Sequence, residues 1–562
     1  MNVSRLRASR DELLRDETRR GRAFGVALAR LLDTELRAAF EDGLPGARVA
    51  LLALGSYARR ELCPGSDVDV LLVHEVRGRR DQAALRKLAE RLWYLLWDAG
   101  FVTGHGTRTV KESLALADED LNALTALLDV RTIAGDETLG TELEGKTHVL
   151  AQRRQGRLLR QLADASELRR VRPGAVAELL EPDVKDGAGG LRDAHALDWA
   201  GWALGEPGGI AALRARGYVS PDDCARIDAG RALLLDIRVE LQRTTGSHSD
   251  RLALQEQDAV ARALEFADAD ALVRALSSAA REIAWIAADV WRRLIDMLAG
   301  PARRGSSDRV VAEHVVLRDG RVHIQHNGEE PVPAYAALEA AIAAAEHDAP
   351  FDRASLTTLR DMTPPSWDVW QRAAFLRLLR TGQHAVPVFE ALDHEGVLSI
   401  FLPEWEHVRS RPQRNAYHRF TVDRHLLEAV AECARLLDGG EDRDAPHDID
   451  RVVARACRRP ELLLLAALLH DLAKGMDGDH SVVGGEVADR IARRIGLDSE
   501  GREILVWLVQ NHLLMAEVAT RRDLSDASVA DNVARRCAGD AERLRLLYLL
   551  TIGDSRATGP AA

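Results

Sequence analysis

One stretch near the N-terminus limits the possible folds of this 562-residue chain more than any other. Residues 49–54 form an apolar run bounded by turn residues, as in a buried strand. Residues 57–62 then suit a short helix ended by a Pro-Gly pair, and residues 67–73 suit a second strand. Side chains alternate along a strand, so Asp67 and Asp69 point to one face while the valines beside them face the core. The pattern predicts a small α/β unit that carries two carboxylates on one face.

A pair of carboxylates opposite a Gly-Ser turn suits a divalent metal and a phosphate. Mg²⁺ prefers carboxylate and phosphate oxygens, Gly55 lets a triphosphate approach the backbone, and amides at a helix start attract anions. An Asp-x-Asp segment alone is commonly a solvated strand face, and a Gly-Ser pair alone is a turn. The combination is more specific, and it predicts a nucleotide site with Mg²⁺ held by Asp67 and Asp69 and the nucleotide bound by Gly55, Ser56 and Arg59.

A second group of polar residues interrupts apolar helices near the C-terminus. Residues 461–469 are apolar on every side of a predicted helix that ends at His470-Asp471. Burying these two side chains without partners would be costly, and metal ligation is the natural compensation. A lone inward histidine is usually a satisfied core residue. Four histidines and two aspartates on successive helical segments instead predict a metal site, with ligands His425, His470, Asp471, His480, His512 and Asp554.

The middle of the chain, residues 137–300, is helical in pattern and is interrupted by a glycine-rich loop at 181–193. Three glycines beside Lys185 could bind phosphate. From the residues alone, a solvated loop between helices is an equally good interpretation. An arginine cluster at 153–172 alternates with leucines, which favours a solvated helix face over an RNA site.

Composition excludes several classes of protein. The net charge of −12 disfavours broad binding to nucleic acid, which needs a basic surface. Five scattered cysteines fit a reducing compartment. The longest apolar stretch, residues 462–469, is too short to cross a bilayer, and the N-terminus does not resemble a signal peptide. We therefore expect a cytoplasmic protein with neither a membrane nor a nucleic acid as partner.

The motifs resemble one known family. The pattern Gly-Ser-x-x-Arg-x-Glu-Leu-x-Pro-x-Ser-Asp-x-Asp at 55–69 resembles the bifunctional uridylyltransferase/uridylyl-removing enzymes of the PII signal protein. Residues 185–193 are similar to that family's Lys-x-Gly-x-Gly-Gly-Leu-Arg-Asp segment. The histidines and aspartates near the C-terminus resemble an HD-type phosphohydrolase. Flanking segments similar to the same family are 417–425, 479–485, 512–515, 521–526 and 554–558.

The resemblance implies transfer of UMP from UTP to a tyrosine of PII at the first site, and hydrolytic removal of UMP at the second. It implies Mg²⁺ at the first site and Mg²⁺, Mn²⁺ or another divalent metal at the second. It also adds Lys185 to the nucleotide-binding residues. The family has His and Arg where this chain has Gln242 and Ser247. A third acidic ligand of the transferase site stays open among three candidates, Asp183, Asp186 and Asp193.

The resemblance also implies the domain plan. We expect a mixed α+β, mostly helical fold: an N-terminal helix and a nucleotidyltransferase domain with a small mixed sheet at 1–136, a helical domain at 137–300, a connecting region at 301–390 and an all-α HD domain at 391–562. Family members continue into a pair of ACT domains that bind glutamine, and we expect this chain to lack them.

Three alternatives remain at this point. Relatives of the family transfer AMP from ATP by the same mechanism, and the Ala- and Arg-rich composition is compatible with that choice. A tRNA nucleotidyltransferase also joins a transferase head to an HD domain, but the acidic net charge disfavours it. A nucleotide sensor without catalysis would not need the intact acids and histidines.

Overall fold

A computed structural model describes residues 3–40, 44, 46–300, 308–326, 330–413, 420–439, 448–523 and 526–559. The chain forms two compact units, 1–299 and 300–562. The expected segments 1–136 and 137–300 fall in the first unit, apart from Gly300, which belongs to the second. Parts of two segments that resemble the uridylyltransferase family lie outside the described residues: Tyr417-His418-Arg419 and Leu524-Ser525.

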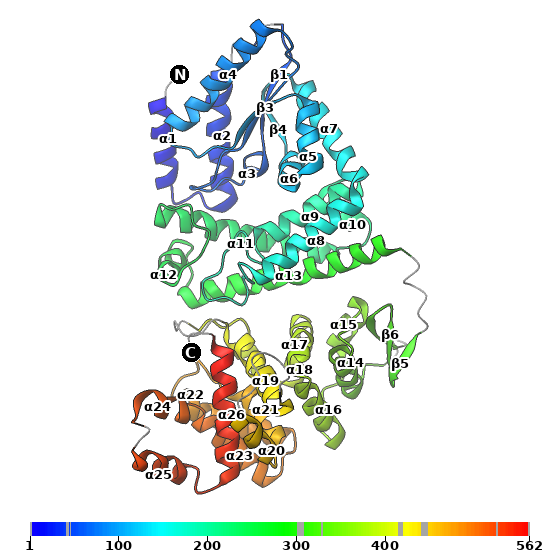
Figure 1. The fold of residues 1–562 in the computed structure, drawn as a ribbon, viewed down its shortest axis with the longest axis vertical. Helices are drawn as coiled ribbons and strands as arrows, with labels where there is room; N and C mark the ends of the chain where they lie inside the picture. The colour runs from blue at the N-terminus through cyan, green and yellow to red at the C-terminus, as the bar shows by residue number, and fades with distance from the viewer. Residues whose placement is uncertain are drawn as a thin grey trace. The chain divides into compact units, whose positions relative to one another are not determined.

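The first unit combines one sheet with helices (Figure 1). Its elements are α1 (Val3–Arg15), α2 (Gly21–Phe40), β1 (Val49–Ala53), α3 (Gly55–Ala58), β2 (Val70–His74), α4 (Arg79–Asp98), β3 (His105–Arg108), α5 (Val110–Glu119), α6 (Leu121–Leu128), β4 (Arg131–Gly135), α7 (Glu137–Arg153), α8 (Gln155–Val171), α9 (Leu191–Leu204), α10 (Gly209–Ala215), α11 (Pro221–Thr245), α12 (Leu254–Ala263) and α13 (Ala269–Ala299).

The sheet has the strand order β3-β2-β1-β4. Strand β1 is antiparallel to both of its neighbours, and β2 is parallel to β3. Helices cover both faces, with α2 and α4 on one side and α5 to α7 on the other (Figure 1). Leu51 packs into the core on the α2 side and Leu52 into the core on the α7 side. This two-sided burial explains why β1 is apolar throughout rather than alternating.

The helices of the middle segment share their core with the sheet. Leu235 of α11 and Leu276 of α13 belong to the same buried cluster as Leu51. Leu197 of α9 belongs to the cluster around Leu52. Helices α9 and α11 are therefore fixed directly against the elements that carry the Asp-x-Asp segment.

The second unit is mostly helical, with a small antiparallel sheet of order β5-β6-β7. Its elements are β5 (Arg309–Ala312), β6 (Val315–Arg318), β7 (Arg321–Ile324), α14 (Ala334–Glu346), α15 (Arg353–Thr358), η2 (Leu359–Asp361), α16 (Val369–Arg380), η3 (Gly382–His384), α17 (Ala385–His394), α18 (Val397–Phe401), η4 (Pro403–His407), α19 (Val422–Asp438), α20 (Asp448–Ala456), α21 (Pro460–Leu469), α22 (His480–Arg494), α23 (Ser499–Asn511), α24 (Leu514–Arg521), α25 (Ala527–Arg536) and α26 (Ala541–Thr558).

The expected fold class, mixed α+β and mostly helical, is confirmed, and α21 is buried on all sides as its sequence predicts. Local boundaries differ from expectation. Strand β2 begins at Val70, so the Asp-x-Asp segment is extended chain before it. Helix α6 ends at Leu128 and is followed by β4, a strand that was not predicted from the sequence. Across the described ranges, no helix is both long and apolar enough to span a membrane.

Two candidate active sites

The Gly-Ser turn, the Asp-x-Asp segment and the loop before α9 line one cavity of about 510 Å³ in the first unit. Three segments that are distant in sequence thus meet at one place. Every residue predicted for the transferase site lies in the wall of this cavity: Gly55, Ser56, Arg59, Asp67, Asp69 and Lys185.

Backbone hydrogen bonds hold the Asp-x-Asp segment between its neighbours. Val68 N donates to Val102 O at 2.9 Å, and Leu54 N donates to Asp69 O at 3.0 Å. Val68 is fully buried, so the alternation of an extended chain turns the carboxylates of Asp67 and Asp69 towards the cavity. The expectation that both acids share one face agrees with this geometry.

The environment of Asp69 favours a cation. Burial first, and then the charge of Asp67, raise the pKa of the Asp69 carboxyl, while Lys185 acts in the opposite direction. Gly104 leaves space for this carboxylate, because a Cβ there would lie 2.1 Å from Asp69 Oδ1. Two neighbouring carboxylates at a cavity wall are a donor set that fits Mg²⁺.

A buried ionic network forms part of this wall. Arg59 contacts Glu61, Nε to Oε2, at 2.8 Å, and it also pairs with Asp129. Glu61 also forms an ion pair with a second arginine, with Arg231 Nη2 at 2.5 Å from Glu61 Oε1. His195 Nε2 lies 2.8 Å from Glu61 Oε2. The network ties the turn after α3 to helices α9 and α11, which carry His195 and Arg231. It fixes the shape of the cavity.

The charges of this network follow from burial. Burial alone would raise the pKa of the Glu61 carboxyl, but His195, Arg231 and Arg59 hold it well below its usual range. Burial, followed by the charge of Arg59, lowers the pKa of His195 to about 3. His195 is therefore neutral, and its Nε2–H donates to the ionised carboxylate of Glu61.

The three acids considered as a third metal ligand all hold the glycine-rich loop. Asp183 Oδ1 accepts hydrogen bonds from two backbone N–H groups, that of Lys185 at 3.0 Å and that of Asp186 at 2.7 Å. Asp186 pairs with Arg192 at 3.1 Å. Asp193 accepts Gly189 N at 2.7 Å, besides an ion pair with an arginine of α8. None of the three belongs to the described wall of the cavity, whereas Asp129 and Asp250 do.

Gln242, which stands where the family has histidine, bridges two parts of the cavity. Its Oε1 accepts a hydrogen bond from Gly65 N at 2.9 Å, and its Nε2 donates one to Asp250 Oδ1 at 2.7 Å. Arg238 also donates to Asp250, at 2.7 Å. The bridge thus links the loop before Asp67 to α11, so the changed residue keeps a structural role.

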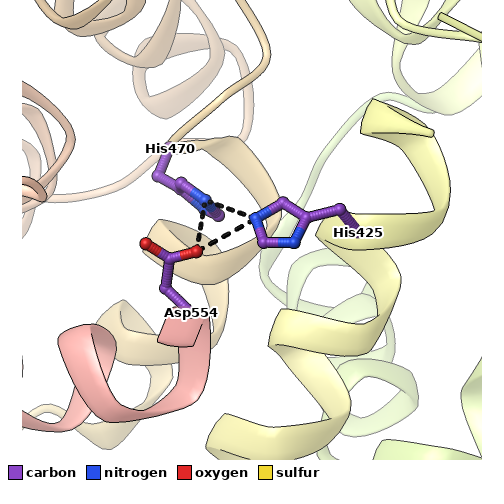
Figure 2. Close-up of side chains that lie close together, drawn as sticks. All are labelled: His425, His470 and Asp554. Carbon is purple, nitrogen blue, oxygen red and sulfur yellow. Dashed lines mark hydrogen bonds and ion pairs between the residues drawn. The ribbon is translucent and has the colours of Figure 1, made fainter. Parts of the chain in front are cut away.

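In the second unit, His425, His470 and Asp554 form one group of possible metal ligands (Figure 2). His425 Nε2 lies 3.0 Å from Asp554 Oδ1 and 3.2 Å from His470 Nε2. His470 Nε2 lies 3.6 Å from Asp554 Oδ1. Ligands about 2.0–2.2 Å from one ion are separated by roughly 3.0–3.5 Å, so the three donor atoms fit a shared cation.

Asp471, His480 and His512 form a second group beside the first. Asp471 Oδ1 lies 3.7 Å from His512 Nε2 and 3.9 Å from His480 Nε2. His470 and Asp471 are adjacent in sequence and contribute to different groups. The second unit therefore brings all six predicted ligands together, with donors for two ions.

Backbone contacts set the histidine rings for ligation. His470 Nδ1 bonds Ala467 O at 2.9 Å, and His512 Nδ1 bonds Val509 O at 2.8 Å. Since a carbonyl only accepts, each Nδ1 carries the proton and each Nε2 keeps its lone pair for a metal. Burial is the main cause that lowers the pKa of His512 to about 4, which favours the neutral ring that ligation requires.

The surroundings of Asp471 fit a cation. Lys474 Nζ donates to its Oδ2 at 2.8 Å, and Lys474 is itself held by Gln413 Oε1 at 2.7 Å. The other oxygen, Oδ1, is buried and has no hydrogen-bond partner among the described residues, and it faces His480 and His512. A buried carboxylate oxygen without a partner is costly, and a divalent cation would satisfy it.

Close helix packing brings Asp554 to the site. Asp554 is on α26, far along the chain from His425 on α19. Gly553 lets the two helices approach, because a Cβ there would lie 2.4 Å from Cys433 Sγ. Helices α22 and α23 also pack closely at a glycine, because a Cβ on Gly485 would lie 2.5 Å from Gln510 Cγ.

Known protein families match separate parts of the chain. A putative nucleotidyltransferase family (DUF294) matches residues 15–115, the GlnD PII-uridylyltransferase family matches 157–291 and the HD domain matches 422–541. Curated proteins named bifunctional uridylyltransferase/uridylyl-removing enzyme match nearly the whole chain. The Streptomyces coelicolor protein is 39% identical over 99% of this chain, and the Mycobacterium tuberculosis protein is 37% identical over 91%.

The chain is a homologue of these enzymes. A third such enzyme, from Erythrobacter litoralis, is 30% identical over 99% of this chain. The chain spans less than two thirds of the length of these uridylyltransferase/uridylyl-removing enzymes: 65% of the S. coelicolor protein, 61% of the M. tuberculosis protein and 63% of the E. litoralis protein. The matched nucleotidyltransferase segment contains Asp67 and Asp69, and the matched HD segment contains every predicted ligand of the second unit except Asp554.

Sequence reasoning missed several residues of both sites. The partners of Glu61 on α9 and α11 left no local signal, because they are more than a hundred residues away. Lys474, which holds Asp471, was not among the predicted site residues. Arg108 of β3 was also missed, although the glycines at alternate positions before it, Gly104 and Gly106, mark a strand face left open for other groups.

Proposed function

We propose that this chain transfers UMP from UTP to a tyrosine hydroxyl of the PII signal protein in the cavity of the first unit, and hydrolyses the resulting phosphodiester at the histidine–aspartate groups of the second. The observation that carries the proposal is the presence of two separate sets of metal-type ligands, one in a nucleotide-sized cavity and one among buried helices. The relatives' names, which pair a uridylyltransferase with a uridylyl-removing activity, support the same two reactions.

In the transferase reaction, Asp67 and Asp69 would hold Mg²⁺, which offsets the charge that builds on the departing pyrophosphate. Gly55 and Ser56 would bind the nucleotide at the turn, where Gly55 adopts a positive φ of 50°. Lys185 lines the cavity from the glycine-rich loop, and Arg59 lines it from the turn after α3. Both would bind the phosphates. The ionic network around Glu61 keeps this wall in place while the tyrosine oxygen attacks the α-phosphorus.

In the removal reaction, the two ligand groups would hold Mg²⁺, Mn²⁺ or another divalent metal, which supplies Lewis-acid activation of the phosphodiester and of water. The backbone bonds of His470 and His512 keep Nε2 of each ring directed at the site. Lys474 orients the Asp471 carboxylate by holding Oδ2, so that Oδ1 stays directed towards His480 and His512. The two activities together form a reversible switch on PII.

The nucleotide base separates the two candidate transfer reactions. The relatives' names favour UTP, while the same geometry would serve ATP. The test is to incubate the chain and Mg²⁺ with purified PII protein and, in separate reactions, UTP, ATP or CTP, and to measure the intact mass of PII. We expect addition of one UMP per PII subunit with UTP only. Addition of AMP would assign adenine as the base, and an unchanged mass with every nucleotide would overturn the transferase proposal.

A further inference from the structure

Five cationic side chains line the cavity of the first unit, and four of them are neutralised by carboxylates. Arg59 pairs with Glu61 and Asp129. Arg192 pairs with Asp186 at 3.1 Å. Arg238 and Lys185 share Asp250, at 2.7 and 3.5 Å. The fifth, Arg108, has no ion pair with any described residue.

We infer that Arg108 binds the β- and γ-phosphates of the nucleotide and stabilises the pyrophosphate as it leaves. The inference rests on the proposed transferase function of this cavity. Among the described arginines and lysines of this wall, Arg108 is half-buried and is the one that no carboxylate pairs, so its charge can bind an anion without first leaving a partner.

The geometry of β3 directs this side chain along the cavity wall. Strands β2 and β3 are parallel, with Leu71 beside Gly106 and Val73 beside Arg108. A Cβ on Gly106 would lie 2.6 Å from Arg108 Nη1, so the guanidinium lies over Gly106. The Asp69 carboxylate lies over Gly104, two residues earlier on the same strand face. The two glycines therefore leave room on one strand face for an anionic group and a cationic group, two residues apart.

Nearby acids do not compete for Arg108. The pKa of Glu112 is lowered first by hydrogen bonds from Thr109, and the charge of Arg108 is the smallest contribution. The Glu112 carboxyl accepts Thr109 N at 2.8 Å and Thr109 Oγ1 at 2.9 Å, as the capping box that starts α5. Glu112 is therefore engaged in holding a helix start.

The reaction places negative charge where Arg108 can reach it. The tyrosine oxygen forms a bond to the α-phosphorus, and its proton is released to solvent. The bond between the α-phosphorus and the oxygen bridging to the β-phosphorus breaks, and that oxygen leaves with its electron pair as part of pyrophosphate. Arg108 donates to the phosphate oxygens before this step and more strongly as their charge increases.

Binding of UTP, UMP and inorganic pyrophosphate to the full chain in Mg²⁺, measured by calorimetry, tests the inference. Arg108→Ala should weaken UTP and pyrophosphate binding by roughly tenfold to a hundredfold, the range for a lost charged hydrogen bond, and leave UMP binding within about twofold. Arg108→Lys should restore part of the loss. Lys111→Ala is the matched control, because Lys111 is an exposed cation on α5 outside the cavity wall.

The outcomes separate this inference from the proposed function. If wild-type protein binds UTP and pyrophosphate and Arg108→Ala binds both equally well, the role of Arg108 is overturned and the cavity remains a nucleotide site. Equal weakening of UMP binding, or a lowered Tm matching the loss, would assign Arg108 a structural role instead. If wild-type protein binds neither UTP nor ATP, the proposed function falls, and the inference with it.

Discussion

The Asp69 carboxylate fills the space that a side chain at Gly104 would need, since a Cβ on Gly104 would lie 2.1 Å from Asp69 Oδ1. Gly104 therefore helps to shape the proposed transferase site although it has no functional group. The relationship also explains why a glycine, Gly104, directly precedes β3 beside the Asp-x-Asp segment. A carboxylate that has to turn towards a metal needs a neighbouring strand with no competing side chain.

Gly104→Ala should lower UMP transfer by about a hundredfold, because displacement of a reacting group by about 1 Å has effects of that size. The clash is with the far end of the Asp69 side chain, so Asp69 rotates and the fold remains. The measurement is the initial rate of PII modification. Gly145→Ala is the matched control, because a Cβ on Gly145 meets no atom within 4 Å. Equal rates in the two variants would contradict the assigned role of Gly104.

Protonation of His195 should destabilise the first unit at mildly acidic pH. The pKa of His195 is lowered to about 3 in the folded protein and is about 6.5 in the unfolded chain. The unfolded state thus binds more protons between these values, so stability falls as pH decreases below about 6.5. At pH 5.5 the loss relative to neutral pH is about 1.4 kcal/mol from this group.

His195→Gln keeps a donor towards Glu61 and removes the titration. Thermal unfolding of both proteins between pH 5.5 and 7.5 should show the wild-type Tm falling about 2 °C more than that of the variant as pH decreases. Parallel curves would mean that His195 does not remain neutral in the folded protein.

Gly553→Ala should weaken the metal site without changing a ligand. Its Cβ would lie 2.4 Å from Cys433 Sγ, so α26 has to move away from α19, which separates Asp554 from His425. We expect lower metal content by elemental analysis, slower removal of UMP from modified PII, and a loss of roughly 1–3 kcal/mol in stability. Adding Cys433→Ala should restore metal content, because it removes the clashing sulfur. A double variant as poor in metal as the single one would show that helix approach is not the cause.

The sequence carried enough information for the transferase strands and for the metal ligands because these depend on local patterns. The run at 49–54 is apolar since β1 is buried on both faces. The helix before His470 is apolar all round, which makes the adjacent His-Asp pair conspicuous. In such cases burial leaves a signal in a few consecutive residues.

Other features depend on distant partners and left no such signal. Strand β4 buries only Ile133 fully, and it exists because β1 offers it an antiparallel edge. The role of Glu61 as the centre of an ionic network appears only when Arg231 and His195 are brought to it by helices packed against the sheet. Only the folded chain shows which cationic side chains of the cavity form ion pairs with carboxylates. This information is what distinguishes Arg108.

Two opposed activities at two independent sites are the central claim, and crossed variants test it most directly. The proteins to compare are wild type, Asp69→Asn, and the double variant His470→Ala/Asp471→Ala. Each is assayed by intact mass of PII for transfer from UTP and for removal from PII modified beforehand, with metal content and Tm measured in parallel. We predict that Asp69→Asn loses transfer by at least about a thousandfold and keeps removal, and that the double variant loses removal and bound metal but keeps transfer. Loss of both activities in either variant at an unchanged Tm would contradict the claim.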